Sequence, residues 1–131
     1  MSRYLILDDD QHRIDSYTAN LKACLSHCEI VVTRHAAECI AELSKPGIFD
    51  RVFLDRSLNG RAFVPDDDPD SGDAVVRFLC DNHEIRRQHI KYVVHSLDEE
   101  KAKRMVRNLL QFQDVRAQYI PGFWTNKEPI R

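Results

Sequence analysis

Residues 4–10, Tyr4-Leu5-Ile6-Leu7-Asp8-Asp9-Asp10, place four apolar side chains directly before three carboxylates. A short run that is apolar at every position is typical of a strand buried on both faces, as in a parallel sheet covered by helices. The acidic residues end the run, because an unpaired charge is costly inside a core. The stretch therefore predicts a buried first strand whose carboxyl end carries acidic groups.

Strand-like and helix-like patterns alternate along the rest of the chain. Short β-branched or aromatic runs predict further strands at 29–33, 52–54, 92–94 and 117–120. Apolar residues at helical spacing predict helices at 13–25, from 36 to the Pro46-Gly47 terminator, at 74–82 and around 102–110. This alternation predicts an α/β fold with a parallel five-stranded sheet, strand order 2-1-3-4-5 as in flavodoxin-like folds, and helices on both faces.

Length and composition narrow the class of protein. The 131 residues fit one domain, with a core at about 4–121 and a tail at 122–131, and 43% apolar residues exclude a disordered chain. A net charge of -2 argues against a nucleic-acid binder or a protein attached to anionic membranes. The sequence shows no apolar run long enough to span a bilayer and no secretory leader, so we expect a cytoplasmic protein.

The four cysteines agree with a reducing compartment. Cys24 and Cys28 flank His27, but a CxxxC pair without a second pair does not match the ligand spacing of zinc sites. Cys39 and Cys80 lie within helical patterns. We therefore predict that the cysteines are small buried apolar residues.

Polar side chains follow three strands that the predicted order makes neighbours. Asp8 and Asp9 follow the first strand, Asp55 the third, and His95 and Ser96 the fourth. Because ligands of open α/β sheets bind beyond the carboxyl ends of the strands, we expect these side chains to share one pocket. Three neighbouring carboxylates need a cation, and oxygen ligands suit Mg²⁺ or Mn²⁺. The predicted metal ligands are Asp8, Asp9 and Asp55.

Other residues near these carboxylates suit a phosphate group. Arg13 and Ser96 are predicted to bind it, and His95, which titrates near neutrality, is the candidate general acid or base. Each has a structural alternative: Arg13 as a surface charge, Ser96 as the cap of the next helix, and His95 as a structural histidine. Asp98 is an equally good cap, and Asp10 is predicted to cap the first helix.

The acidic segment Asp66-Asp67-Asp68-Pro69-Asp70 lacks the spacing of a calcium loop. We predict a solvated loop there, with a lid or an additional acidic wall beside Asp55 as alternatives. Ser71-Gly72-Asp73 then predicts the start of a helix.

The Asp8-Asp9 pair, Asp55 and the hydroxyl of Ser96 resemble the site of a CheY-like response-regulator receiver domain, and the resemblance covers Tyr4 to about Pro121. It implies that the acidic pair and Asp55 hold Mg²⁺ and that Asp55 accepts a phosphoryl group. The chain departs from this pattern after the fifth strand, where Ile120 stands in place of the receiver lysine. A fifth helix is also missing from the sequence pattern.

A narrower family resembles the chain more closely. The string from Leu7 to Arg13, the Ser71-Gly72-Asp73 turn, and Val94-His95-Ser96 followed by Arg104-Met105 are similar to motifs of the cyclic-phosphate-processing receiver-like domains. This resemblance implies binding or processing of a cyclic phosphate, such as a cyclic nucleotide, with His95 and Asp55 as the catalytic residues. Metal-dependent phosphodiesterase-type catalysis and binding alone both remain open.

Two departures bear on that activity. Asp55-Arg56-Ser57-Leu58 stands where these domains usually carry Asp-His-Asp-Leu, and Asp98 stands where they often carry Asn. Arg56 adds a positive charge that favours phosphate binding, so we include it among the predicted phosphate-binding residues.

Two other hypotheses follow from the same residues. One is a stand-alone receiver phosphorylated on Asp55. The other is a degenerate receiver that acts as an interaction module, in which Gly122-Phe123-Trp124 contacts a protein partner or a second copy of the chain. Phe123 and Trp124 covering the end of the sheet is the structural alternative.

Overall fold

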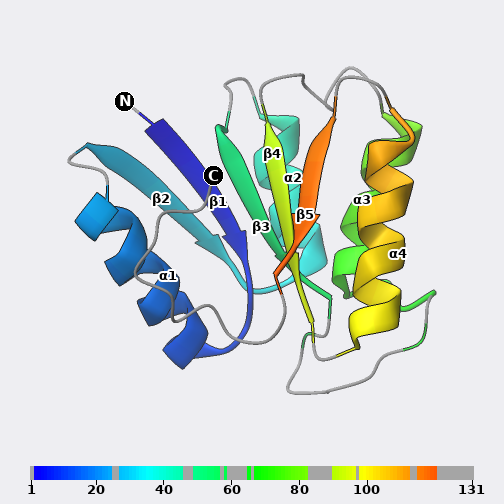
Figure 1. The fold of residues 1–131 in the computed structure, drawn as a ribbon, viewed down its shortest axis with the longest axis horizontal. Helices are drawn as coiled ribbons and strands as arrows, with labels where there is room; N and C mark the ends of the chain where they lie inside the picture. The colour runs from blue at the N-terminus through cyan, green and yellow to red at the C-terminus, as the bar shows by residue number, and fades with distance from the viewer. Residues whose placement is uncertain are drawn as a thin grey trace.

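The structure, a computed structural model, alternates strands and helices as the sequence predicts (Figure 1). It describes residues 2–24, 27–45, 49–56, 58, 65, 67–82, 90–96, 98–112 and 115–120. The elements are, in chain order, β1 (Ser2–Leu7), α1 (Gln11–Cys24), β2 (Cys28–Thr33), α2 (Ala36–Ser44), β3 (Arg51–Asp55), α3 (Gly72–Asp81), β4 (Lys91–His95), α4 (Glu99–Leu110) and β5 (Arg116–Tyr119).

The strands form one parallel sheet in the order β2-β1-β3-β4-β5, which confirms the predicted topology. Within it Leu7 of β1 pairs with Leu54 of β3, and Asp55 at the end of β3 pairs with His95 at the end of β4. The carboxyl ends of these strands therefore lie side by side at one edge, where the sequence placed the polar residues.

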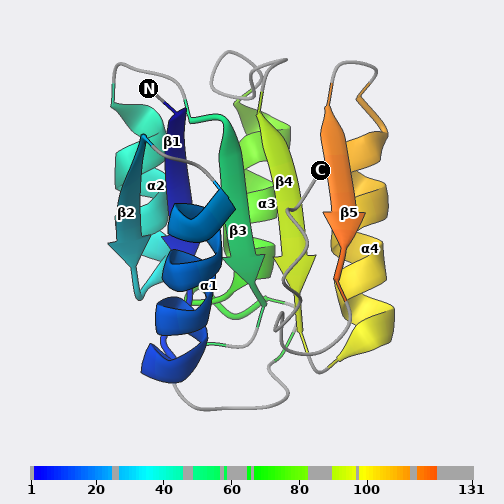
Figure 2. The same cartoon turned by 60° about the vertical axis from the view of Figure 1, so that its left-hand side comes forward.

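Helices cover both faces of the sheet, but unequally. α1 lies on one face, and α2, α3 and α4 lie on the other (Figure 2). Side chains alternate along each strand: Leu5 and Leu7 belong to the larger core on the three-helix side. Ile6 and Phe53 belong to a smaller core beneath α1. By this alternation, Asp55 and His95 project toward the α1 side.

Helix caps explain why the helices begin where they do. α1 begins at Gln11, two residues before the predicted start, because Asp10 accepts a hydrogen bond from the backbone N–H of Arg13 (3.1 Å). This confirms Asp10 as a cap. α3 begins at Gly72 rather than 74, because Ser71 accepts from the backbone N–H of Ala74 (3.3 Å). The prediction that Ser71 opens a helix is therefore confirmed.

Gly72 holds the start of α3 against the end of β3. Its backbone N–H donates to the carbonyl of Arg56 (3.2 Å). A Cβ at this position would lie 2.7 Å from the Asp55 carbonyl oxygen and 2.9 Å from the Arg56 Cα. Because real side chains do not approach backbone so closely, only glycine lets α3 pack directly behind Asp55.

Some predictions are modified or fall outside the described residues. Cys39 is buried, as predicted, whereas Cys28 and Cys80 are partly exposed. Among the described residues, no helix is both long and apolar enough to cross a membrane. The tail at 122–131, including Gly122-Phe123-Trp124, lies outside the described residues, and so does Asp66.

Candidate metal and phosphate site

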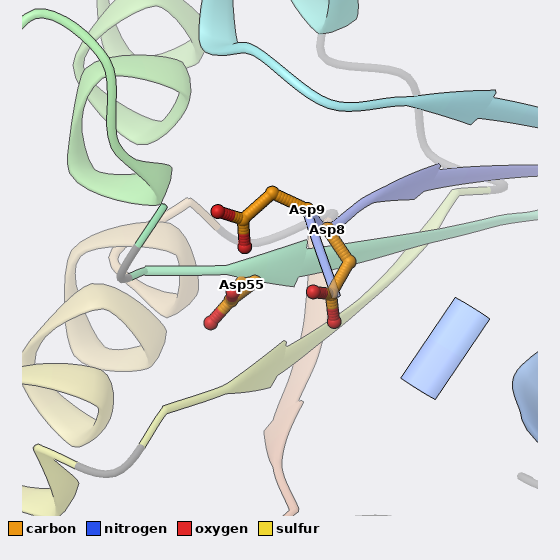
Figure 3. A group of neighbouring side chains, drawn as sticks. All are labelled: Asp8, Asp9 and Asp55. Atoms are coloured by element: carbon orange, nitrogen blue, oxygen red, sulfur yellow. The ribbon is translucent and has the colours of Figure 1, made fainter. Parts of the chain in front are cut away.

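Three carboxylates meet at the carboxyl ends of β1 and β3 (Figure 3). Asp8, Asp9 and Asp55 each offer an oxygen, and these oxygens all lie within 4.8 Å of one another. Asp8 and Asp55 are only 1% and 3% exposed, whereas Asp9 is half-buried. Clustered and mostly buried carboxylates repel one another and lack water, so the arrangement requires positive charge nearby.

Arg13 supplies positive charge inside this cluster. Its Nε and Nη2 donate to the two oxygens of Asp8, both at 2.9 Å, and Nη2 also donates to Asp55 at 3.1 Å. Burial lowers the pKa of the Arg13 guanidinium. The hydrogen bond to Asp8 and the charges of Asp55, Asp8 and Asp10 together raise the pKa by more than burial lowers it, so the net effect is an increase. The structure thus brings the predicted phosphate ligand Arg13 to the site, with its guanidinium on the carboxylates.

The position of Arg13 follows from the start of α1. It is the third residue of the helix, and the Asp10 cap fixes its backbone beside the end of β1. Asp10 itself is 3.8 Å from Arg13 Nη1, and the backbone N–H of Asp10 donates to Asp8 at 2.9 Å. The turn from β1 into α1 therefore aims the guanidinium back at the strand end.

His95 lies next to Asp55 across the β3–β4 pair and is 3% exposed. Its Nδ1 has no hydrogen-bond partner among the described residues. Burial and the charge of Arg13 lower the pKa of the imidazole, against smaller opposing effects of Asp8 and of a hydrogen bond with the Ile120 backbone. His95 is therefore neutral near pH 7 and presents a ring nitrogen suited to accept a proton.

Ser96 is buried at the same edge, and its Oγ accepts a hydrogen bond from the backbone N–H of Asp98 (3.1 Å). Asp98 in turn caps α4 by accepting from Lys101 (3.3 Å). Asp98 thus serves as the cap, while the Ser96 hydroxyl also shapes the turn into α4. Because a hydroxyl carries one proton besides its acceptor lone pairs, Ser96 retains a hydrogen to donate.

Arg56 lies away from the solvent. Its side chain is fully buried, and Nε lies 2.7 Å from a carboxylate oxygen of Asp73 in the first turn of α3. Its charge is therefore neutralised within the protein by Asp73, whereas the sequence predicted Arg56 as a phosphate-binding residue. The alternation along the strand gave no signal for this pair, because Asp73 becomes a neighbour of Arg56 only through the close approach at Gly72.

The acidic segment before α3 contacts α2. The Asp70 carboxylate accepts from the backbone N–H of Ala36 (2.8 Å) and lies 2.8 Å from Nδ1 of His35. Asp68 accepts from the backbone N–H of Asp70 at 2.8 Å. Asp70 thus caps the start of α2 from a distant part of the chain.

Sequence reasoning did not single out two residues near the carboxylates. Arg34, which follows β2, donates to the backbone carbonyl of Asp9 (3.4 Å) and to the side chain of Gln11. Tyr17 on α1 is buried, and burial followed by the charges of Asp8 and Asp55 raises its pKa. Arg34 could have been predicted at the site, because it follows the carboxyl end of β2, a strand adjacent to β1. Tyr17 matched the ordinary apolar spacing of a helix.

The donor set fits a hard divalent cation. Three carboxylate oxygens within one coordination sphere match the oxygen ligands of Mg²⁺ and Mn²⁺, which keep several waters in such sites. The described part of the chain has no other cluster of this kind. The carboxylates that the sequence predicts as metal ligands are therefore together in the structure.

Solved receiver structures share this fold. A CheY-like response regulator receiver domain protein from Methanospirillum hungatei JF-1 is 20% identical, with a TM-score of 0.62 over 92% of this chain and 81% of that chain. The Mn²⁺-bound form of response regulator Rcp1 is 16% identical (TM-score 0.64, 92% and 81%). The phosphorylated cyanobacterial phytochrome response regulator RcpA is 17% identical (TM-score 0.66, 92% and 79%).

Sequence comparison gives the family. No curated protein matches the chain. The model of the cyclic-phosphate processing receiver domain matches residues 3–111, which include the carboxylates, Arg13, His95 and Ser96. Since this match covers most of the sequence, the chain belongs to the cyclic-phosphate processing receiver domain family.

Proposed function

We propose that the protein binds a cyclic phosphate, such as a cyclic nucleotide, and opens its phosphodiester ring with the help of a divalent metal ion. The observation that carries this proposal is the row formed by Asp8, Asp55 and the neutral His95 at the ends of three adjacent strands. The family match supports the choice of substrate class. An ordinary phosphoacceptor site has no need of a buried base beside the acidic cluster.

In this proposal, different side chains bind the metal ion, bind the phosphate and transfer the proton. Asp8, Asp9 and Asp55 would hold Mg²⁺ or Mn²⁺, which polarises a phosphate oxygen when bound. Arg13 and Ser96 hold the phosphate through a guanidinium fork and a hydroxyl donor. Nδ1 of His95 takes a proton from the attacking water as its oxygen bonds to phosphorus, and returns that proton to the ester oxygen that leaves. Arg56 stays outside this set because its charge is paired with Asp73.

Substitution of the base tests the catalytic part of the proposal. His95→Gln preserves a polar side chain of similar size but removes the basic nitrogen, so we expect ring opening to slow by about 100-fold or more. Hydrolysis of a panel of cyclic nucleotides with Mn²⁺ measures this, and calorimetry of ligand binding serves as the control. Unchanged turnover in His95→Gln would exclude His95 as the base, and retained binding without turnover in the wild type would identify a binding protein.

A specific observation supports a second candidate, a receiver phosphorylated on Asp55. Arg13 Nη2 lies 3.1 Å from Asp55, so a cation stands at the acceptor carboxylate although the receiver lysine is missing. In this case, a small phosphodonor with Mg²⁺ labels the wild type and leaves Asp55→Asn unlabelled.

A further inference from the structure

We infer that Arg13 is a built-in competitor of the metal ion for Asp8 and Asp55, and that metal binding releases its guanidinium to hold phosphate. The inference rests on the metal site of the proposed function and names how that site is regulated. It makes metal and phosphate binding mutually strengthening. It also implies a second position of the Arg13 side chain, away from Asp8 and Asp55, when the metal ion is bound.

The hydrogen bonds of Arg13 use the same lone pairs that a metal ion needs. Asp8 Oδ2 accepts from Nε at 2.9 Å, and Oδ1 accepts both from Nη2 and from the Asp10 backbone N–H, each at 2.9 Å. The same Nη2 donates to Asp55 Oδ2 at 3.1 Å. One guanidinium thus links the two most buried members of the cluster, and a metal ion bound to them has to take acceptor sites from it.

The positive charge of Arg13 makes it a stronger competitor of the metal ion than its hydrogen bonds to Asp8 and Asp55 would alone. A guanidinium does not lose its proton in proteins, and the charges of Asp8 and Asp55 favour its charged form still more. Arg13 therefore leaves the carboxylates by moving rather than by becoming neutral. A divalent ion within a few ångströms repels it, and this repulsion acts at a site with little water to screen it.

The side chain has a route outward that leaves the helix intact. The backbone of Arg13 is fixed in the first turn of α1 by Asp10, whereas 20% of its side chain is exposed. Rotation about the side-chain torsions brings the guanidinium from the carboxylates to the solvent side of the site. There its planar fork matches two oxygens of a phosphate that also faces the metal ion. By linkage, each ligand then increases the affinity for the other by the same factor.

Calorimetric titration of Mg²⁺ into the full chain tests this inference without any activity measurement. Arg13→Gln removes the charge, so we expect it to bind Mg²⁺ about tenfold more tightly than the wild type. Inorganic phosphate should strengthen Mg²⁺ binding several-fold in the wild type and leave Arg13→Gln unchanged. Arg107→Gln, an exposed substitution in the last turn of α4, is the matched control and should bind like the wild type.

The outcomes separate this inference from the proposed function. Asp55-dependent Mg²⁺ binding that is equal or weaker in Arg13→Gln overturns the competition and leaves the metal site intact. Absence of Asp55-dependent binding in both the wild type and Arg13→Gln overturns both. Circular dichroism checks folding, because Arg13→Gln removes the guanidinium charge beside two buried carboxylates. If it is unfolded, the wild type alone decides the outcome: Mg²⁺ affinity that inorganic phosphate leaves unchanged in the wild type overturns the inference, because released Arg13 has to couple the two ligands.

Discussion

The His95 side chain lies where burial and Arg13 oppose protonation of the ring. In the folded chain the imidazole therefore stays neutral at a pH where the unfolded chain takes up a proton. Its contribution to the free energy of unfolding is complete above the ordinary histidine pKa of about 6.5 and decreases as the pH falls below that value. His35 has the opposite sign, because Asp70 raises its pKa and protonation strengthens their contact. The contribution of His35 is present below about pH 6.5 and is lost as the pH rises through the raised folded value.

This opposition gives a prediction for His95. In a His35→Gln background, the chain should lose stability between about pH 7.5 and about pH 5.5, and His95→Gln should reduce that loss. Urea unfolding at the two pH values measures the free energies of unfolding. An equal loss with and without His95→Gln would show that the imidazole is not held neutral by its surroundings.

Some residues of the site could be predicted individually from the sequence, and others could not. Asp8, Asp9 and Asp55 were predictable because strand ends in a known order have fixed neighbours. The contact of Arg13 with Asp8 and Asp55 was not predictable, because helical spacing places the Cα of Arg13 but does not determine which carboxylates its guanidinium binds. The burial of Asp8 and Asp55 decides that choice, and burial depends on the packed structure.

At the scale of elements, the join between β3 and α3 positions Asp55. Gly72 lies against the Asp55 carbonyl, and Ser71 caps α3. The Arg56–Asp73 ion pair next to them is buried. A buried ion pair is costly unless both partners are held in place, and Gly72 and Ser71 hold them. The sequence predicted a helix start at Ser71 but not the contact with Asp55, because the contact joins residues separated by a long segment.

Gly72→Ala tests this join. The new Cβ would fall 2.7 Å from the Asp55 carbonyl, so the end of β3 has to shift. We expect a loss of about 1–3 kcal/mol in the free energy of unfolding, as for overpacked cores, and weaker Mg²⁺ binding because Asp55 moves. Ala74→Gly, two residues further along α3, is the control: it should cost about 0.5–1 kcal/mol and leave Mg²⁺ affinity unchanged. Wild-type Mg²⁺ affinity in Gly72→Ala would show that Asp55 does not depend on this contact.

At the scale of the whole molecule, a larger core lies on one face of the sheet and the site lies at one edge, on the side of α1. The topology was predictable because short apolar runs, each followed by a helical pattern, permit few arrangements of a parallel sheet. Apolar periodicity alone placed the starts of α1 and α3 two residues too late, whereas the predicted cap residues Asp10, Ser71 and Asp98 mark the helix starts through single hydrogen bonds. The fold thus follows from the pattern, and the site depends on local contacts.

The most direct test is calorimetric titration of Mn²⁺, followed by cyclic nucleotides, into the wild type, Asp55→Asn and Asp81→Asn. Asp81 is an exposed carboxylate at the end of α3 and controls for the loss of one charge. We predict that the wild type and Asp81→Asn bind Mn²⁺ and then a cyclic nucleotide, whereas Asp55→Asn loses at least tenfold in Mn²⁺ affinity, about 1.4 kcal/mol. Equal binding of Mn²⁺ by all three proteins, or no cyclic nucleotide bound by the metal-loaded wild type, would contradict the proposed function.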